Sequence, residues 1–248
     1  MCGYVAVSSV QGAGRVISQD HETKYLDLMG ADYTDAHAAL EQEVEDFSTL
    51  SPQTRELVLI ATYSAITLFD RDSVRHHVAR ALDLGVEPSA IRAAFVVGAI
   101  GSHSMTEVVP VLVDEMATEG YHGELDSDPD AADELRAWVQ ATRDFYSPVW
   151  DGVVAMHPAY VRRYQKLMSV PLGVDAKIQE LLIIAVDAAT THLNVSGARV
   201  HIRKALRIGV SPRDILSVIE LVSLVGYRSA HMGTDVLGQE LERRAVQH

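Results

Sequence analysis

Two closely similar apolar stretches decide the fold of this chain: ELVLIA at residues 56–61 and ELLIIA at residues 180–185. When the same offset of 124 residues is kept, further identities follow in one ungapped register. The paired positions are Thr67 and Thr191, Arg75 and Arg199, His77 and His201, Gly85 and Gly209, and Pro88 and Pro212. A register of about forty residues indicates an internal repeat, so we interpret the chain as two fused copies of one unit.

Each copy is predicted to contain three consecutive helices. The first helix follows Ser51 in one copy and Asp175 in the other, both good N-cap residues, and is almost wholly apolar, as a central buried helix should be. The second helix has apolar residues at helical spacing and ends at Gly85 or Gly209, which suit the left-handed position after a helix. A proline then begins the third helix in both copies.

The predicted organisation is two domains joined by a linker. We place the N-terminal unit at residues 1–119, a linker rich in Gly and Asp at residues 120–133, and the C-terminal unit at residues 134–248. Additional helices are expected upstream of each repeated stretch, at residues 33–47 and 134–168. Because no segment alternates polar and apolar residues for long, we predict an all-α fold built as a tandem repeat.

Composition argues against several classes of protein. The 248 residues are 48% apolar, enough for a large core, and the only cysteine, Cys2, cannot form a disulfide within the chain. A reducing, cytoplasmic setting is the natural inference. No segment has the roughly 18 apolar residues of a membrane span. The formal charge of −13 repels nucleic acid and anionic membranes, so we expect a small molecule as the binding partner.

A histidine lies on the apolar stripe of the second helix in each copy, at His77 and His201. A buried imidazole needs hydrogen-bond partners, and a satisfied structural histidine is the simpler interpretation. Glu56 and Glu180, near the start of the apolar helix, either point to solvent or are desolvated, and a desolvated carboxyl has a raised pKa. In the second case each carboxylate would face its histidine as an acid–base pair.

These residues carry a resemblance to a known superfamily. The pattern of residues 55–57, His77, Gly85 and a Val-x-Pro before an apolar helix resembles the unit of the carboxymuconolactone decarboxylase and alkylhydroperoxidase D-like superfamily. Residues 180–209 repeat it. The similarity covers residues 51 to about 116 and 175 to about 240, and it implies the all-α fold of that superfamily.

The chain departs from the peroxidase branch of the superfamily. In that branch a Cys-x-x-Cys pair precedes the histidine and reduces the peroxide, but this chain has Asp70 and Ser73 in the first copy and Asn194 and Gly197 in the second. A hydroxyl or amide cannot replace a low-pKa thiolate, so thiol peroxidase chemistry is excluded. The separation of 21 residues between each glutamate and its histidine is also two longer than the family pattern.

The resemblance therefore implies the cysteine-free decarboxylase branch, which removes CO2 from a small cyclic acid without a cofactor. That chemistry needs a group that stabilises a developing enolate and an acid that protonates carbon. His201 and Glu180 are the first catalytic candidates, and His77 and Glu56 are their counterparts. We predict a cofactor-independent lyase or related acid–base enzyme for a small oxygenated acid or lactone. The alternative is a non-catalytic ligand-binding or scaffold member.

The second copy has additional polar residues near these positions. His192 precedes its second helix, where the first copy has Leu68, and Tyr227 and His231 follow its third helix. We include all three histidine and tyrosine residues among the catalytic candidates. They make the second copy the preferred location of an active site.

Three basic residues are candidates to bind a substrate carboxylate: Arg228, its first-copy counterpart His103, and Arg199. Arg199 lies well round the helix from His201, so a solvated or interface salt bridge is the favoured interpretation for it. The candidate histidines lack the i, i+4 spacing of a helical metal pair, so no metal is predicted. Superfamily members associate through helical faces, and the resemblance implies a homo-oligomer, with a trimer favoured.

Overall fold

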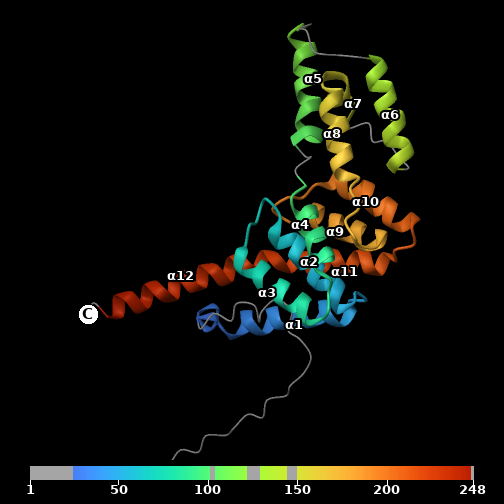
Figure 1. Ribbon diagram of the computed structural model, residues 1–248. Coiled ribbons are helices and arrows are strands. Elements are labelled where there is room, and N and C mark those ends of the chain that lie inside the picture. The colour runs from blue at the N-terminus through green and yellow to red at the C-terminus, as the bar shows by residue number, and fades with distance from the viewer. Residues whose placement is uncertain (1–24, 101–103, 122–128, 144–149, 247–248) are drawn as a thin grey trace, which may run out of the picture.

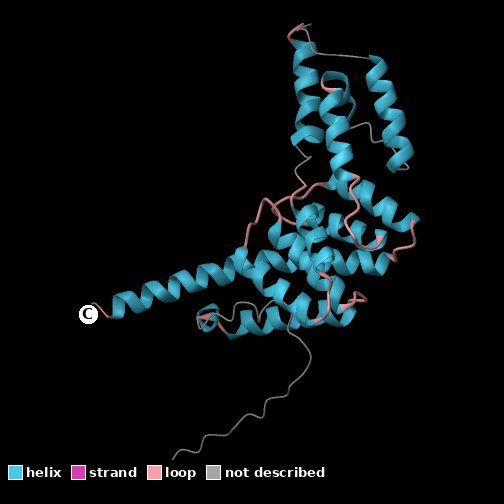
Figure 2. Ribbon diagram, viewed as in Figure 1, coloured by secondary structure: helices cyan, strands magenta, loops and turns pink. Residues whose placement is uncertain are grey.

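The computed structural model describes residues 25–100, 104–121, 129–143 and 150–246. Within these ranges all regular structure is helical (Figure 2), which confirms the predicted all-α class. The elements are η2 (Leu26–Met29), α1 (Ala31–Phe47), α2 (Pro52–Ser64), α3 (Arg71–Asp83), α4 (Pro88–Gly98), η3 (Ser104–Val108), α5 (Val109–Thr118), α6 (Pro129–Arg143), α7 (Asp151–Met156), α8 (Pro158–Met168), α9 (Ala176–Ala188), α10 (Val195–Arg207), α11 (Pro212–Leu224), η5 (Val225–Tyr227) and α12 (Arg228–Ala245).

The predicted helix triplets are α2, α3 and α4 in the first copy and α9, α10 and α11 in the second. The side chain of Ser51 accepts the first-turn amide of Thr54, and Asp175 accepts that of Lys177, so both apolar helices begin at the expected N-caps. Gly85 and Gly209 have left-handed φ angles of 76° and 82°, as expected for the residue after a helix.

The core is built on α2 and α9, which pack against each other near the centre of the molecule (Figure 1). Helices α3 and α4 pack on α2, and α10 and α11 pack on α9. Val58, Leu182 and Ile184 are fully buried. Burying one such side chain contributes about 1.5–3 kcal/mol, so α2 and α9 supply the framework on which α3, α4, α10 and α11 pack.

Helices α5, α6, α7 and α8 form a second, smaller cluster that stands apart from the core (Figure 1). Its buried residues include Leu135, Val154 and Val161. Helix α5 approaches α7 closely, because a methyl group added to Gly152 would lie only 3.2 Å from side-chain carbons of Val109 and Val113.

Several features recur at the offset of 124 residues and support the predicted repeat. The hydroxyl oxygens of Thr67 and Thr191 are 3.0 Å apart, so equivalent residues of the two copies meet each other. Phe69 and Leu193, also equivalent, both have positive φ angles, 48° and 38°. Left-handed backbone is rare for residues with bulky side chains. Its presence at two equivalent positions therefore supports the repeat.

The domain boundaries stay a prediction, with one difference at the linker. Helix α6 begins at Pro129, inside the segment 120–133 that we expected to be irregular. A proline at the first helical position favours this earlier start. In the described part of the chain, no helix combines the length and hydropathy needed to cross a membrane.

The left-handed glycines generate a stability prediction. Gly85→Ala should lower the free energy of unfolding by about 1–2 kcal/mol, because a Cβ is strained at this φ although the space around it is open. Gly233→Ala is the matched control, since Gly233 lies inside α12 with open space and no positive φ. The control should be neutral or stabilising by up to about 1 kcal/mol. Urea denaturation followed by circular dichroism measures both variants, and equal effects would contradict the role assigned to Gly85.

Candidate functional site

A buried glutamate pairs with a histidine on the neighbouring helix in each copy. Nδ1 of His77 lies 2.8 Å from Oε2 of Glu56, and Nδ1 of His201 lies 2.8 Å from Oε2 of Glu180. The second oxygen of each carboxylate binds a cation one turn further along, Arg80 at 3.0 Å in the first copy and Lys204 at 2.7 Å in the second. The convergence predicted for these residues is therefore present twice.

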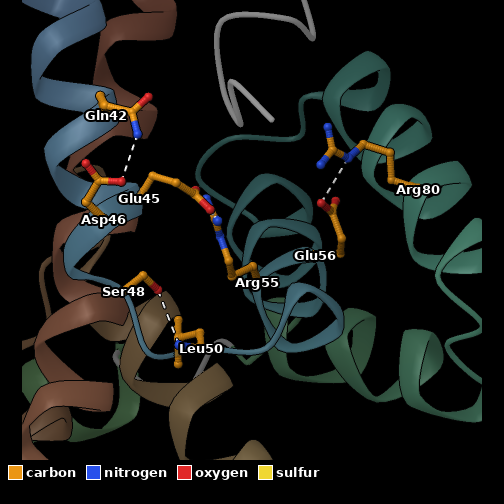
Figure 3. A network of polar contacts seen from close by, with 8 residues as sticks. All are labelled: Gln42, Glu45, Asp46, Ser48, Leu50, Arg55, Glu56 and Arg80. Atoms are coloured by element: carbon orange, nitrogen blue, oxygen red, sulfur yellow. Dashed lines mark hydrogen bonds and ion pairs between the residues drawn. The ribbon is translucent and has the colours of Figure 1, made fainter. Parts of the chain in front are cut away.

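Figure 3 shows how α2 uses two consecutive residues to hold two different helices. The Glu56 side chain points toward Arg80 of α3. The neighbouring Arg55 side chain turns the other way and forms an ion pair with Glu45 of α1. The charged residues of this mostly apolar helix thus fix the positions of α1 and α3.

The two pairs differ in solvent access. The His77 side chain is completely buried, whereas the His201 side chain is 23% exposed. The ring of Tyr63 stacks on His77 at a centroid distance of 5.4 Å, and the equivalent residue in the second copy is Asp187, which has no ring to cover the imidazole. Tyr63 therefore covers one face of His77, and no ring stands at the equivalent position beside His201.

The pKa of the Glu180 carboxyl is lowered, contrary to the raised pKa expected of a desolvated carboxyl. Burial by itself would raise the pKa, but the hydrogen bonds and positive charges of His201 and Lys204 outweigh burial. The carboxylate therefore stays ionised and accepts the Nδ1 hydrogen of His201. This leaves Nε2 as the ring nitrogen that can exchange a proton.

A pocket of about 380 Å³ lies at the junction of the two copies. Its residues come from the loop before α3, the loop after α9, the end of α11, η5 and the start of α12: Leu68, Asp70, Ala189, Thr190, Thr191, Val222, Val225, Gly226, Arg228, Ser229 and Met232. This volume is at the lower end of the range for small-molecule sites, and the wall is mainly apolar with a few polar groups, as such sites usually are.

An ion pair between the two copies forms the charged wall of this pocket. Nε of Arg228 donates to Oδ2 of Asp70 at 2.9 Å. Asp70 is also the N-cap of α3 and accepts the backbone N–H and the hydroxyl of Ser73. Burial would raise the pKa of Asp70, but the bonds from Arg228 and Ser73 together lower it, so the carboxyl is ionised at neutral pH.

A line of polar groups runs from this pocket into the core. The Ser73 hydroxyl donates to Asp70 at 2.9 Å. His77 lies four residues after Ser73, on the same face of α3 and one turn further along. His77 in turn binds Glu56, so α3 carries two hydrogen-bonded pairs one turn apart: Ser73 with Asp70 at the pocket, and His77 with Glu56 in the core.

Comparison with known proteins points to one superfamily. The model of the carboxymuconolactone decarboxylase family matches residues 156–230. A crystal structure from Burkholderia xenovorans, described as a "putative gamma-carboxymuconolactone decarboxylase subunit", is similar over 92% of this chain and 95% of its own, with a TM-score of 0.81 and 27% sequence identity. The two likenesses support a relationship to the carboxymuconolactone decarboxylase-like superfamily. No curated protein sequence matches it.

In light of this relationship, the positions of Asp70 and Ser73 are informative. They occupy the sites of the two peroxidase cysteines in the sequence pattern, and the structure places Asp70 in the wall of the pocket. In the sequence, Asp70 and Ser73 indicated only that the cysteines are absent. The ion pair could not be predicted, because Arg228 lies 158 residues away from Asp70 along the chain.

Tyr227 and His231 lie in a different setting from Arg228, against α1 rather than in the pocket. The ring of His37, on α1, is 4.7 Å from that of Tyr227 and 5.4 Å from that of His231. Burial and the neighbouring Tyr227 raise the pKa of Tyr33, which stacks on His37. His37 and Tyr33 were not among the predicted site residues, because nothing in the repeat indicates that residues of α1 contact Tyr227 and His231.

The remaining candidates are dispersed. His192 is half-buried in the loop after α9 and directly follows the pocket residues Thr190 and Thr191. Arg199 is exposed on α10, away from His201. His103 lies outside the described residues. Among the residues that the structure describes, no group of three or more histidine, cysteine or acidic side chains is arranged to hold a metal ion.

The lowered pKa of Glu180 generates a pH prediction. A carboxyl whose folded-state pKa lies below its ordinary 4.5 stabilises the fold above that pH and loses the contribution as the pH falls through the folded-state value. At pH 7, Glu180→Gln should destabilise the protein by roughly 1.5–3 kcal/mol, the range for a hydrogen bond to a charged group. The difference from the natural protein should shrink below about pH 4.5.

Urea denaturation at several pH values measures this difference. Glu43→Gln is the control, because Glu43 is exposed on α1. It should have little effect at any pH. A destabilisation by Glu180→Gln that stays constant from pH 7 to pH 3 would mean that the charge on Glu180 contributes nothing to the fold.

Proposed function

We propose that the protein is a cofactor-independent lyase, or a related acid–base enzyme, that acts on a small oxygenated organic acid or lactone. The observation that carries this proposal is the pocket between the two copies, with Arg228 and Asp70 in its wall and the Ser73–His77–Glu56 line behind it. The family likeness and the decarboxylase description of the similar structure support the same class of reaction.

Arg228 is the proposed substrate-binding residue. Its Nε binds Asp70, and within the described residues its two Nη groups have no assigned partner, so they can donate to a carboxylate or to the oxygen of a developing enolate. The chain carries a formal charge of −13, so an anionic substrate approaches against an unfavourable field. A local cation in the pocket is therefore needed for binding.

The line behind Asp70 is the proposed route for a proton. Because its pKa is lowered, Asp70 is ionised at neutral pH and is a weak base, so a proton that reaches it would pass on readily to a stronger base. The His77–Glu56 pair, reached through Ser73, can hold a proton that the reaction releases or consumes. This route places the chemistry at the first copy, with Arg228 supplied by the second.

The Glu180–His201 pair remains the rival acid–base centre. In its favour, the His201 imidazole is partly exposed and its Nδ1 is fixed by an ionised carboxylate. Neither pair lines the pocket itself. The first-copy pair takes first place because Ser73, one turn before His77, binds the pocket residue Asp70, whereas Gly197 stands at the position equivalent to Ser73 in the second copy.

The first experiment tests the binding of small carboxylates and lactone acids by calorimetry. Arg228→Met should weaken binding about 10- to 100-fold, the equivalent of one charged hydrogen bond. Asp70→Asn should strengthen binding, because it removes the carboxylate that competes for Arg228. Asn is an equally good N-cap and is the natural residue at position 194 in the second copy. Changes of the same sign in both variants would exclude an anion site at Arg228.

The second experiment tests catalysis on a substrate found in that panel, with CO2 release or lactone opening as the readout. His77→Gln should lower kcat at least tenfold without weakening substrate binding, and His201→Gln should have the smaller effect. Circular dichroism confirms that each variant is folded. If only His201→Gln reduces kcat, the acid–base centre is the α10 pair and the proton route through Ser73 is wrong.

A non-catalytic ligand-binding member is the second candidate. The complete burial of His77 favours it, because a sealed imidazole cannot touch a ligand. In this case Arg228→Met would still weaken binding about 10- to 100-fold, but the natural protein would convert no compound that it binds.

We also propose that the protein works in the cytoplasm as a homo-oligomer, with a trimer favoured. The lone cysteine fits a reducing compartment. Exposed apolar side chains on α5, α10 and α12, among them Val111, Leu206 and Leu237, provide surfaces for association.

A further inference from the structure

Helix α10 presents an apolar groove bordered by a row of arginines. The groove is lined by Val195, Ala198, Ile202 and Leu206, which form one stripe at helical spacing, and by Arg199, Arg203 and Arg207 beside them. All three arginines are exposed, and no ion pair in the described part of the chain involves them. Like charges four residues apart destabilise a helix by roughly 0.2–0.5 kcal/mol per pair, so an acidic partner would relieve a repulsion.

Helix α5 presents a face of complementary charge. Val108, Val111, Leu112, Glu115 and Glu119 form one stripe that continues from the residue before the helix to the residue after it. The three apolar members are between 49% and 60% exposed, and both acids are exposed. This stripe is not the side that meets α7, because Val109 and Val113, about a third of the way round α5 from it, approach Gly152.

The acids of α5 lie at its electrostatically unfavourable end. The carbonyl end of a helix carries a partial negative charge that favours cations. No basic residue occupies the last turn of α5, and Glu119 is its C-cap. A basic partner over this end would offset both the helix dipole and the two carboxylates.

We propose that the α10 groove of one molecule receives the Val108–Glu119 face of α5 from a second copy of this chain. The apolar stripes pack on each other, and the arginine row binds Glu115 and Glu119. This inference rests on the proposed self-association and names the surfaces that carry it. Since the two surfaces differ, the contact is head-to-tail and can close into a ring such as a trimer.

Leu193 extends the apolar surface of α10. It immediately precedes the N-cap Asn194, is 62% exposed, and has a left-handed φ of 38°. A bulky residue in this conformation is strained, and such strain persists where the surrounding structure enforces it. The strained backbone holds a leucine in solvent next to Val195, where a second copy would cover both.

A second copy fits this surface better than an anionic polymer or membrane. A basic amphipathic helix can bind lipid, but the formal charge of −13 repels anionic lipid and nucleic acid alike. The chain itself supplies an apolar stripe with acids at one end. Within one chain α5 packs with η3 and α7, so its acidic face is left for another molecule.

Charge exchange tests the contact by sedimentation velocity. Arg203→Glu and Glu115→Arg should each weaken self-association at least tenfold and shift the protein toward monomer. The double variant Arg203→Glu/Glu115→Arg should recover the assembly, because the attractive pair is restored with its signs reversed. Arg163→Glu, the same change at an exposed arginine of α8, is the control and should leave the assembly intact.

Three results would overturn the proposal. The natural protein could sediment as a monomer, both single variants could remain assembled, or the double variant could stay dissociated. Binding of the natural protein to vesicles containing phosphatidylserine, lost in Arg203→Glu without any self-association, would assign the groove to membranes instead. Small-molecule binding by the Arg228 pocket, measured on the same variants, shows whether the proposed function survives independently of the assembly.

Discussion

The structure depends on the need to satisfy a carboxylate inside each apolar helix. Glu56 and Glu180 are nearly fully buried in the two helices that form the core, where an unpaired charge would be strongly destabilising. Each therefore requires an imidazole on one oxygen and a cation on the other. Those partners come from α3 and α10, so the same contacts that neutralise the carboxylates also set the position of the second helix in each copy.

The two buried carboxylates are paired in the same way, but the histidines that pair with them differ in solvent exposure. In the first copy, Tyr63 covers His77 and the pair is sealed. In the second copy Asp187 stands at that position, and His201 reaches solvent. The ion pair between Asp70 and Arg228 then joins the copies and gives the first copy a pocket. The two copies therefore share a framework but differ in their accessible polar groups. The second copy has a partly exposed imidazole, and the charged pocket lies where the copies meet.

The parts predicted from sequence are those that local chemistry or repetition determines. The N-caps Ser51 and Asp175, the left-handed glycines, and the approach of each glutamate to its histidine all follow from short-range signals present twice. The pairing was predictable because both partners lie 21 residues apart within one helical hairpin.

What could not be predicted depends on contacts between distant segments. Asp70 meets Arg228 across 158 residues, and the ring of His37 on α1 meets that of His231 near the start of α12. No spacing in the sequence encodes either meeting. A raised pKa was the expectation for Glu180 if its carboxyl was desolvated, but the hydrogen bonds and charges of His201 and of Lys204, one turn beyond it, lower the pKa. Lys204 is visible in the local sequence, but only the structure shows that its side chain points toward Glu180.

The contact between Thr67 and Thr191 has a consequence for the symmetry of the molecule. Two equivalent hydroxyls that face each other at 3.0 Å cannot both donate, because a hydrogen bond between them has one hydrogen and one direction. One threonine must give and the other receive. Even if the surrounding sequences were identical, the two threonines would therefore differ in the position of a proton, and reversing this bond would exchange their roles without moving the backbone.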